Sequence, residues 1–287
     1  MRKLLMQVTR ENFWDFMAMA SFGEPWIHNE KMDVSGGITT IEDIDELAKH
    51  PDCEVVSISG LKQDTFEYFI KKYGQQFKAI RFHKNKLVND WSLLSTLENL
   101  EYFYWFFNQR ISSFWDMSLN TSLKGVCIEN FCKLKSIKGI EKAPNLESLF
   151  LGDAVWATST IEDISCLKNS SINELNFYGK DILNSDFSFV LDMPRLQKLD
   201  FSANLLTTEQ VAWIVANRPD LQGYCLGAIA IPVDEDPDDF QNFIVVGKGK
   251  RKYRLSGNER RLEQVRKDFD LLVQRYVGAE YPQSERA

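Results

Sequence analysis

The sequence predicts an α/β fold built on a unit that recurs every 23–26 residues, and two observations support this class. Residues 196–204 fit the frame L-x-x-L-x-L-x-x-N, with Phe201 as the third apolar residue. Between successive frames, several segments show the apolar spacing of amphipathic helices. The eight frames start at Cys53, Phe77, Leu100, Leu123, Leu146, Ile172, Leu196 and Leu221.

Three columns of this frame are apolar throughout. The first, fourth and sixth positions of all eight frames hold apolar residues, counting Cys and Tyr, although only 44% of the chain is hydrophobic. Side chains alternate along a strand, so columns four and six point to one face and columns three, five and seven to the other. The ninth column is weaker, with asparagine only at Asn85, Asn108 and Asn204. We therefore expect one strand per frame, with Trp105 of column six in the core.

In these columns the chain resembles the leucine-rich-repeat family, in a degenerate form, over roughly residues 53–228. The resemblance implies a solenoid, an α/β horseshoe in which about eight parallel strands line the concave side. Helices or short turns would line the convex side. Family members mostly present the concave sheet to another protein, so the resemblance also implies a protein partner.

The segments outside the repeat are predicted to cap it, because the open core of a solenoid must be sealed at both ends. Residues 1–52 form the predicted N-terminal cap, in which a helix over about 9–20 covers the first repeat. Residues 229–287 form the predicted C-terminal cap, a β-hairpin (243–246 and 253–255) followed by a helix over 259–276. The apolar residues expected to seal the N-terminal end are Phe13, Trp14, Phe16, Met17 and Trp26.

Three further helices are expected, one near 40–49 in the N-terminal cap and two near 64–73 and 207–216 within the repeats. Capping boxes mark the starts of two of them: Thr39 with Glu42, and Thr207 with Gln210. The segment between Leu151 and Ile172 is longer than its counterparts and rich in Ser and Thr, so we expect a loop that bulges from one edge.

Composition narrows the class of function. A net charge of −7 argues against a nucleic-acid binder, because phosphate contacts need clustered cations. The five cysteines are odd in number and lack the paired spacing of a zinc site, so we expect buried reduced thiols in a cytoplasmic protein. We find no apolar run of signal-peptide or membrane-spanning length, and we expect a monomer when free.

Four features could suggest chemistry, and each has a plainer interpretation. Gly247–Lys250 lacks the spacing of a phosphate-binding loop, so a hairpin turn is favoured. The basic residues at 248–254 could contact nucleic acid, and the acidic loop at 234–239 could hold calcium, but solvated loops are the default for both. None of the three histidines, His28, His50 and His83, lies near a nucleophile motif. We therefore predict no enzyme activity, no cofactor and no metal.

The strongest functional signal is the predicted concave face. Strand alternation places five aromatic residues in its columns, and large exposed apolar groups cost solubility unless something covers them. Aromatic residues flanked by charges are typical of binding hot spots, although a terminal segment folded over this face would also explain them. The predicted partner-binding residues are Arg81, His83, Tyr102, Tyr104, Phe106, Glu129, Phe150, Glu174, Tyr178 and Asp200.

The functional hypothesis is a non-enzymatic protein-binding module. An acidic stand-alone horseshoe is similar in outline to ribonuclease inhibitor-like proteins, so the first hypothesis is an inhibitor or immunity-type protein that neutralises a toxin or enzyme. The second is a bacterial effector or scaffold that grips a host or regulatory protein. The third is an enzyme whose activity lies in the C-terminal cap.

Overall fold

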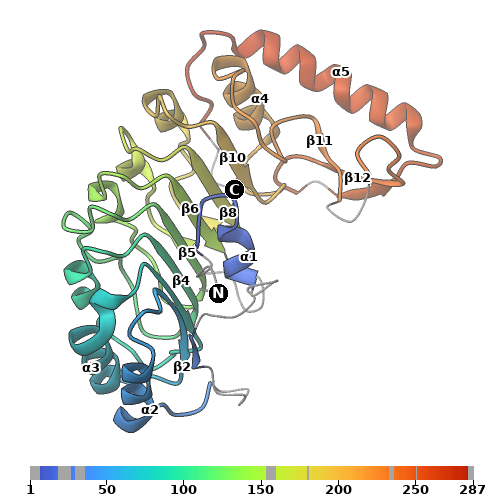
Figure 1. Ribbon diagram of the computed structural model, residues 1–287. Coiled ribbons are helices and arrows are strands. Elements are labelled where there is room, and N and C mark those ends of the chain that lie inside the picture. Colours follow the sequence, from blue (N-terminus) through green and yellow to red (C-terminus); the bar gives the residue numbers. More distant parts are fainter. Residues whose placement is uncertain are drawn as a thin grey trace.

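The computed structural model describes residues 7–18, 27–29, 36–152, 160–179, 181–232, 236–249 and 251–283. Its largest element is an eight-stranded sheet in which every pairing is parallel and the strand order follows the sequence. Figure 1 shows that the strands stack along a curve and that the sheet does not close on itself. The strands are β1 (Ile27–Asn29), β2 (Val55–Ser59), β3 (Ala79–His83), β4 (Tyr102–Asn108), β5 (Gly125–Phe131), β6 (Ser148–Gly152), β8 (Glu174–Tyr178) and β10 (Lys198–Phe201).

The register of the sheet confirms the columns predicted from the sequence. Val56 pairs with Ile80, Ile80 with Phe103, and Phe103 with Val126, so that position four of one frame meets position four of the next. The column-four and column-six residues of the first seven frames are buried, and Trp105 is fully so. The alternation of apolar residues therefore identified both the strands and the face that they bury.

The eighth strand is not the one expected from the sequence. The frame that starts at Leu221 contributes only a single bridge, between Gln222 and Lys198. Beyond it the Tyr224 N–H donates to the Asp200 carboxylate at 2.5 Å instead of continuing the ladder. The eighth strand is β1, which pairs with β2 at the opposite end of the sheet.

The connections between strands run along one side of the sheet, which we call the convex side after the curve in Figure 1. Helix α3 (Gln63–Tyr73) confirms the helix expected near 64–73, and most other connections here are short 3-10 helices. Their bounds, with those of α2, are α2 (Ile41–Asp45), η1 (Glu46–Lys49), η2 (Gly74–Gln76), η3 (Ser92–Thr96), η4 (Ile140–Lys142), η5 (Ser165–Leu167) and η6 (Ser188–Asp192). Strand β7 (Thr160–Ile161) lies within the segment expected to bulge, of which 153–159 lie outside the described residues, and it pairs with β9 (Asp181–Ile182).

Buried asparagines satisfy the backbone where the chain turns out of the strands. The Asn108 amide donates to the carbonyls of Asn85 and Val88 at 3.0 and 2.9 Å. Its carbonyl oxygen accepts the N–H groups of Arg110 and Ile111 at 2.7 and 2.8 Å. Asn85 instead bonds to the preceding frame, where it donates to the carbonyl of Ile58 at 3.0 Å and accepts the N–H of Leu61 at 2.8 Å. Asn204 is exposed. Two of the three predicted asparagines therefore hold the turns, as their position in the frame suggests.

Helix α2 begins one residue later than the predicted capping box. Thr40, not Thr39, is the N-cap, and its box partner is Asp43 rather than Glu42. The hydroxyl of Thr39 is already used, because it donates to the carbonyl of Ser59 at 2.5 Å.

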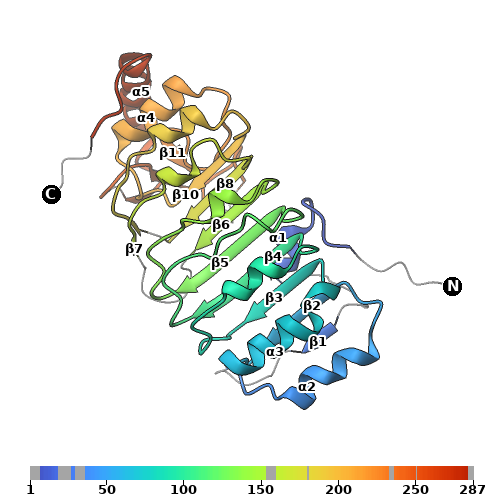
Figure 2. The same cartoon turned by 90° about the vertical axis from the view of Figure 1, so that its left-hand side faces the viewer.

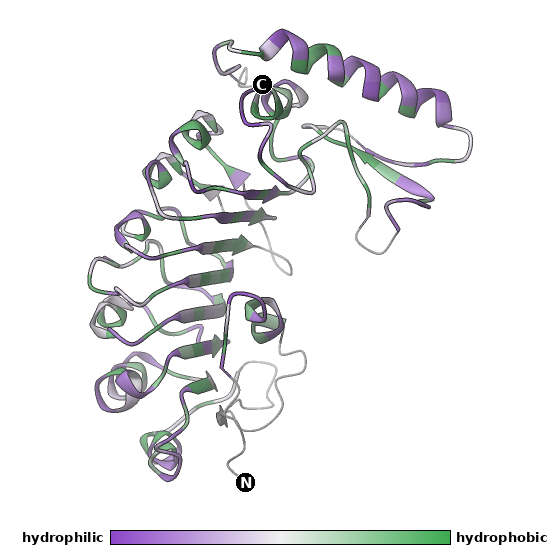
Figure 3. Cartoon of the chain, turned by 45° about the horizontal axis from the view of Figure 1, so that its top comes forward, coloured by the Kyte–Doolittle hydropathy of each residue, from purple (hydrophilic) through white to green (hydrophobic). Residues whose placement is uncertain are grey.

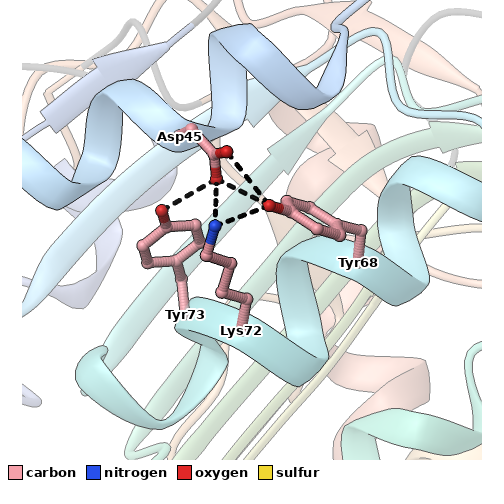
Figure 4. Close-up of polar contacts among 4 residues, drawn as sticks. All are labelled: Asp45, Tyr68, Lys72 and Tyr73. Atoms are coloured by element: carbon pink, nitrogen blue, oxygen red, sulfur yellow. Dashed lines mark hydrogen bonds and ion pairs between the residues drawn. The ribbon is translucent and has the colours of Figure 1, made fainter.

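A polar cluster then joins α2 to α3 on the convex side. Figure 4 shows Tyr68, Lys72 and Tyr73 converging on the Asp45 carboxylate, with distances of 2.7–2.9 Å to its Oδ1 atom. Lys72 lies 5.0 Å above the ring of Tyr68, and its ammonium group lowers the pKa of Asp45. All four side chains are paired with one another, so we interpret this cluster as a structural contact.

The C-terminal residues form a unit at the end of the sheet, beyond β10 (Figure 2). Helices α4 (Thr208–Asn217) and α5 (Glu259–Tyr276) confirm the two helices expected there, and the predicted box of Thr207 and Gln210 caps α4. The predicted hairpin is β12 (Asn242–Val245) with β13 (Lys252–Arg254), and β11 (Ile229–Ala230) adds a third antiparallel strand. Phe243, Val245 and Leu262 form a separate small core between this sheet and α5. Figure 3 shows that the rest of α5 is mostly hydrophilic.

The N-terminal helix α1 (Phe13–Ala18) lies where the sequence did not place it. Figure 1 shows α1 on the side of the sheet opposite α3, against the middle strands rather than over the first repeat. We call this side the concave face. The prediction that this helix seals the end of the repeat is wrong for residues 7–18, and Trp26 lies outside the described residues. At that end the sheet is extended by β1 instead.

Candidate functional site

The concave face carries a second apolar cluster, separate from the main core. Phe13, Phe16 and Met17 of α1 and Val8 before it are buried in this cluster. The spacing i, i+3, i+4 puts these three helical side chains on one face of α1. The strands supply Val55, Ala79, Tyr102, Tyr104 and Cys127, one or two residues from each of β2 to β5.

A glycine on β5 lets α1 approach the sheet closely. A Cβ atom on Gly125 would lie 2.8 Å from the ring of Phe13 and 2.8 Å from the ring of Tyr102. The Phe13 ring lies 5.2 Å from that of Tyr102 and 6.2 Å from that of Phe150. The absence of a side chain at this one strand position therefore creates the seat for Phe13.

An open cavity of about 1220 Å³ continues along the concave face from α1 towards β10. One wall is α1, whose Trp14 ring lies 5.9 Å from that of Phe150 and is 61% exposed. The floor is the sheet, where Tyr178 is 38% exposed. The aromatic side chains around the cavity are Phe13, Trp14, Tyr104, Phe106, Phe150 and Tyr178.

A buried polar group lies at the end of the cavity nearest β3. Tyr104 donates its hydroxyl to the Glu129 carboxylate at 2.7 Å, and the Arg81 guanidinium lies 5.2 Å from the centre of the Tyr104 ring. Arg81 also donates to the hydroxyl of Ser57 at 3.2 Å. Adjacent strands bring these residues together, because Arg81 pairs with Tyr104 and Tyr104 with Cys127 in the register.

Burial dominates the protonation of this group. It lowers the pKa of Arg81 to about 10, an effect that Glu129 partly offsets. It also raises the pKa of Tyr104, which Cys127 and Glu129 raise further. At neutral pH Tyr104 is therefore a neutral donor, held in place by a carboxylate and flanked by a cation.

The opposite end of the cavity is more open and more polar. Glu174 lies 3.8 Å from the ammonium group of Lys198 on the next strand. The Asp200 carboxylate accepts a hydrogen bond from the N–H of Tyr224. The carboxylates of Glu174 and Asp200 and the exposed ring of Tyr178 therefore lie on the neighbouring strands β8 and β10.

The ten residues predicted to bind a partner fall into three groups. Tyr102 and Tyr104 are buried beneath α1, 4% exposed each, and Arg81 is 6% exposed, so the expectation that these positions are free of the core is wrong. Asp200 is half-buried next to the cavity in register with Asn176. The remaining six line the open cavity, as the buried Arg81 and Tyr104 also do: His83, Phe106, Glu129, Phe150, Glu174 and Tyr178.

The sequence did not identify several residues of the cavity. Trp14 and Met17 were assigned to a cap, and Arg10, Glu11, Asn176 and Lys198 were not assigned to a site. The sequence shows the apolar residues of the N-terminal helix, but it does not indicate which surface of the fold they pack against.

All five cysteines are free thiols, and none forms a disulfide. Cys53, Cys127 and Cys225 are buried, as expected, but Cys132 is exposed and departs from that prediction. Burial raises the pKa of Cys225 to about 12 and that of Cys166 likewise to about 12. Among the described residues, no group of three or more His, Cys, Asp and Glu side chains is placed to hold a metal ion.

A scan against protein-family models and a search of curated proteins both gave no match to this chain. In the described part of the chain, we find no helix with both the length and the apolar character needed to cross a bilayer.

Proposed function

We propose that this chain is a leucine-rich-repeat type solenoid whose concave face binds a protein partner. The one-strand-per-frame register and the asparagines that hold the turns support the repeat assignment. The proposal treats the N-terminal helix as part of the concave side and the unit after β10 as the C-terminal cap.

The observation that carries the proposal is the aromatic cavity beside α1. Trp14 and Tyr178 remain exposed there, whereas the other Phe, Tyr and Trp rings of the described residues are buried or half-buried. Exposed aromatic side chains bordered by ionisable groups are the usual composition of a binding hot spot. Glu129 and Glu174 on the cavity floor would orient a partner that presents matching donors.

Within this class we favour an inhibitor or immunity-type protein that acts as a cytoplasmic monomer and neutralises a toxin or enzyme. The support is the analogy of an acidic stand-alone repeat with ribonuclease inhibitor-like proteins. An effector or scaffold would use the same face. The two roles differ in outcome, because an inhibitor abolishes the activity of its partner at equimolar ratio and a scaffold leaves that activity intact.

The test replaces Trp14 and Tyr178 by Ala and compares the double variant with a matched control. Trp14 is 61% exposed and Tyr178 38% exposed, so truncation should cost under about 0.5 kcal/mol at Trp14 and about 1–2 kcal/mol at Tyr178. The control is Leu183→Ala with Leu191→Ala, which truncates two exposed apolar residues that do not line the cavity.

Binding partners are recovered on the immobilised wild-type chain, identified by mass spectrometry and titrated against all three proteins by calorimetry. We expect the double variant to lose about 2 kcal/mol or more of binding free energy and the control to lose none. Equal affinity for the double variant and the wild type would refute the concave site.

A further inference from the structure

The N-terminal segment 7–18 is a helix seated on the concave face by contacts that the main core does not share. Its buried side chains, Phe13, Phe16 and Met17, meet strand residues that belong to the concave cluster and not to the core between the sheet and the convex helices. We propose that this part of the concave face is a docking site for an amphipathic helix of the protein partner, and that α1 fills the site in cis until the partner helix displaces it. This inference rests on the proposed function and names the kind of partner and the regulation of its site.

A helix is the form of ligand that this face can accept. The strands of the sheet use their N–H and C=O groups in the parallel ladder, so the face offers only side chains to a ligand. A segment buried there must satisfy its own backbone hydrogen bonds, and a helix does so internally whereas an extended peptide does not. The structure contains one example, since α1 binds through apolar residues at i, i+3 and i+4.

The same contacts indicate that α1 can leave without unfolding the sheet. A helix of six residues is too short to be stable alone in water, so α1 holds its shape only while it is docked. The core that contains Trp105 and Phe103 involves no residue of α1. Departure of α1 would expose Tyr102, Tyr104 and the seat at Gly125, a patch that needs a new cover.

The cavity beside α1 provides the entry point. A helix is about 10 Å across and rises about 1.5 Å per residue, so a cavity of this size would hold on the order of ten helical residues. Trp14 on the exposed side of α1 faces this space. A partner helix can therefore contact the open part of the face first and then exchange with α1.

The first experiment uses the unmodified full chain and measures amide hydrogen exchange by mass spectrometry. If α1 opens independently, the amides of 13–18 should exchange at least 100-fold faster than those of β4 and β5. Equal protection of α1 and the strands would mean that α1 leaves only on global unfolding, and this result would overturn the proposal.

The second experiment tests whether an external helix can bind. The full chain with Phe13→Ala, Phe16→Ala and Met17→Ala lacks the cis anchors, and a fluorescein-labelled synthetic peptide of residues 7–18 serves as the probe. We expect the triple variant to bind the peptide at least tenfold more tightly than the wild type, because a tethered cis copy competes at an effective concentration of millimolar order.

Two controls locate the binding. Adding Gly125→Leu to the triple variant should abolish binding, because a side chain there would occupy the seat of Phe13. Adding Gly152→Ala should not, because the nearest atoms to a Cβ on Gly152 lie 3.5 Å away, an ordinary contact. Loss of cooperative thermal unfolding in the triple variant would show that α1 is an obligatory part of the fold and would overturn the proposal, as would peptide binding no tighter than that of the wild type.

These outcomes are independent of those for the proposed function. If α1 proves inseparable from the sheet, a partner can still bind the open cavity through Trp14 and Tyr178, and the calorimetry would detect it. If the Trp14 and Tyr178 variants bind the partner normally, the proposed site fails even where the peptide displaces α1.

Discussion

Trp105 offers a test of the core because two substitutions at this position should have very different costs. The side chain is fully buried, with ring centroids 4.4 Å from Phe82, 5.7 Å from Trp91 and 5.8 Å from Phe66. Trp105→Ala removes all of these contacts and leaves a large cavity, which costs roughly 3–5 kcal/mol. Because β4 pairs with both β3 and β5, the loss should also loosen these two strands.

Trp105→Phe should cost much less, for a reason specific to this site. Among the described residues, the indole N–H of Trp105 has no hydrogen-bond partner. Leaving a buried donor unpaired costs about 1–3 kcal/mol, and phenylalanine removes that penalty together with part of the packing. The two effects oppose each other, so the net change should stay within about 1 kcal/mol.

Urea unfolding followed by far-UV circular dichroism measures both variants against the wild type. Trp105→Ala should be at least about 2 kcal/mol more destabilising than Trp105→Phe. If Trp105→Phe is as destabilising as Trp105→Ala, the indole N–H is bonded in solution and the unpaired-donor explanation is refuted.

Three further predictions concern other parts of the molecule. Asn108→Ala should destabilise the chain by about 2–4 kcal/mol in urea unfolding, because several buried backbone groups lose their hydrogen-bond partner. Asn204→Ala, at an exposed position, should cost under about 0.5 kcal/mol. Burial raises the pKa of Tyr102 from 10.0 to about 12, so the folded state keeps this proton when the unfolded state has lost it. The resulting stability, about 2 kcal/mol, is present below pH 10 and lost between pH 10 and 12. Over this range, thermal unfolding should show that the stability of Tyr102→Phe falls by about 2 kcal/mol less than that of the wild type. Alkylation by iodoacetamide at pH 8 should modify Cys132 well before Cys127 or Cys225, and peptide mass spectrometry would detect the order; early modification of Cys127 would mean that α1 is open most of the time.

The sheet could be predicted from the sequence because its information is local and repeated. Column six placed Phe82, Trp105 and Ile128 in the core, and the structure buries each of them completely. The helices of the C-terminal unit were equally visible, since the apolar spacing of 259–276 matches α5 residue for residue. A pattern of this kind needs no knowledge of what lies across the fold.

The errors came from contacts between distant segments. The frame at Leu221 looks like its neighbours, but Asp200 on the preceding strand takes the Tyr224 N–H and ends the ladder. The start of α2 was missed by one residue because Ser59, twenty positions away, already binds the hydroxyl of Thr39. In both cases a hydrogen bond to a residue about twenty positions away determined where the element begins or ends, and the local sequence does not show that bond.

The position of α1 is the error that matters for function. The sequence shows two surfaces in need of cover, the open end of the repeat and an aromatic face on the strands, and one short apolar helix that could cover either. In the structure β1 extends the sheet at the end, and α1 covers the aromatic face around Tyr102 and Tyr104. While α1 is docked, these two rings are not exposed, and their exposure is no argument for a partner in that state.

The aromatic surface that folding does not explain is therefore limited to the rings around the open cavity beside α1. α1 covers only part of the face, and it adds an exposed ring, Trp14, to those of the cavity that it borders. Burying the concave aromatics needs only Phe13 and Phe16, and it gives no reason for a third aromatic residue of α1, Trp14, to line an open cavity next to Phe150. The exposed rings of Trp14 and Tyr178 lower the solubility of the free protein, and they are covered only when a ligand occupies the cavity. This is why the case for a partner is stronger at the junction of α1 with β6 and β8 than at the face as a whole.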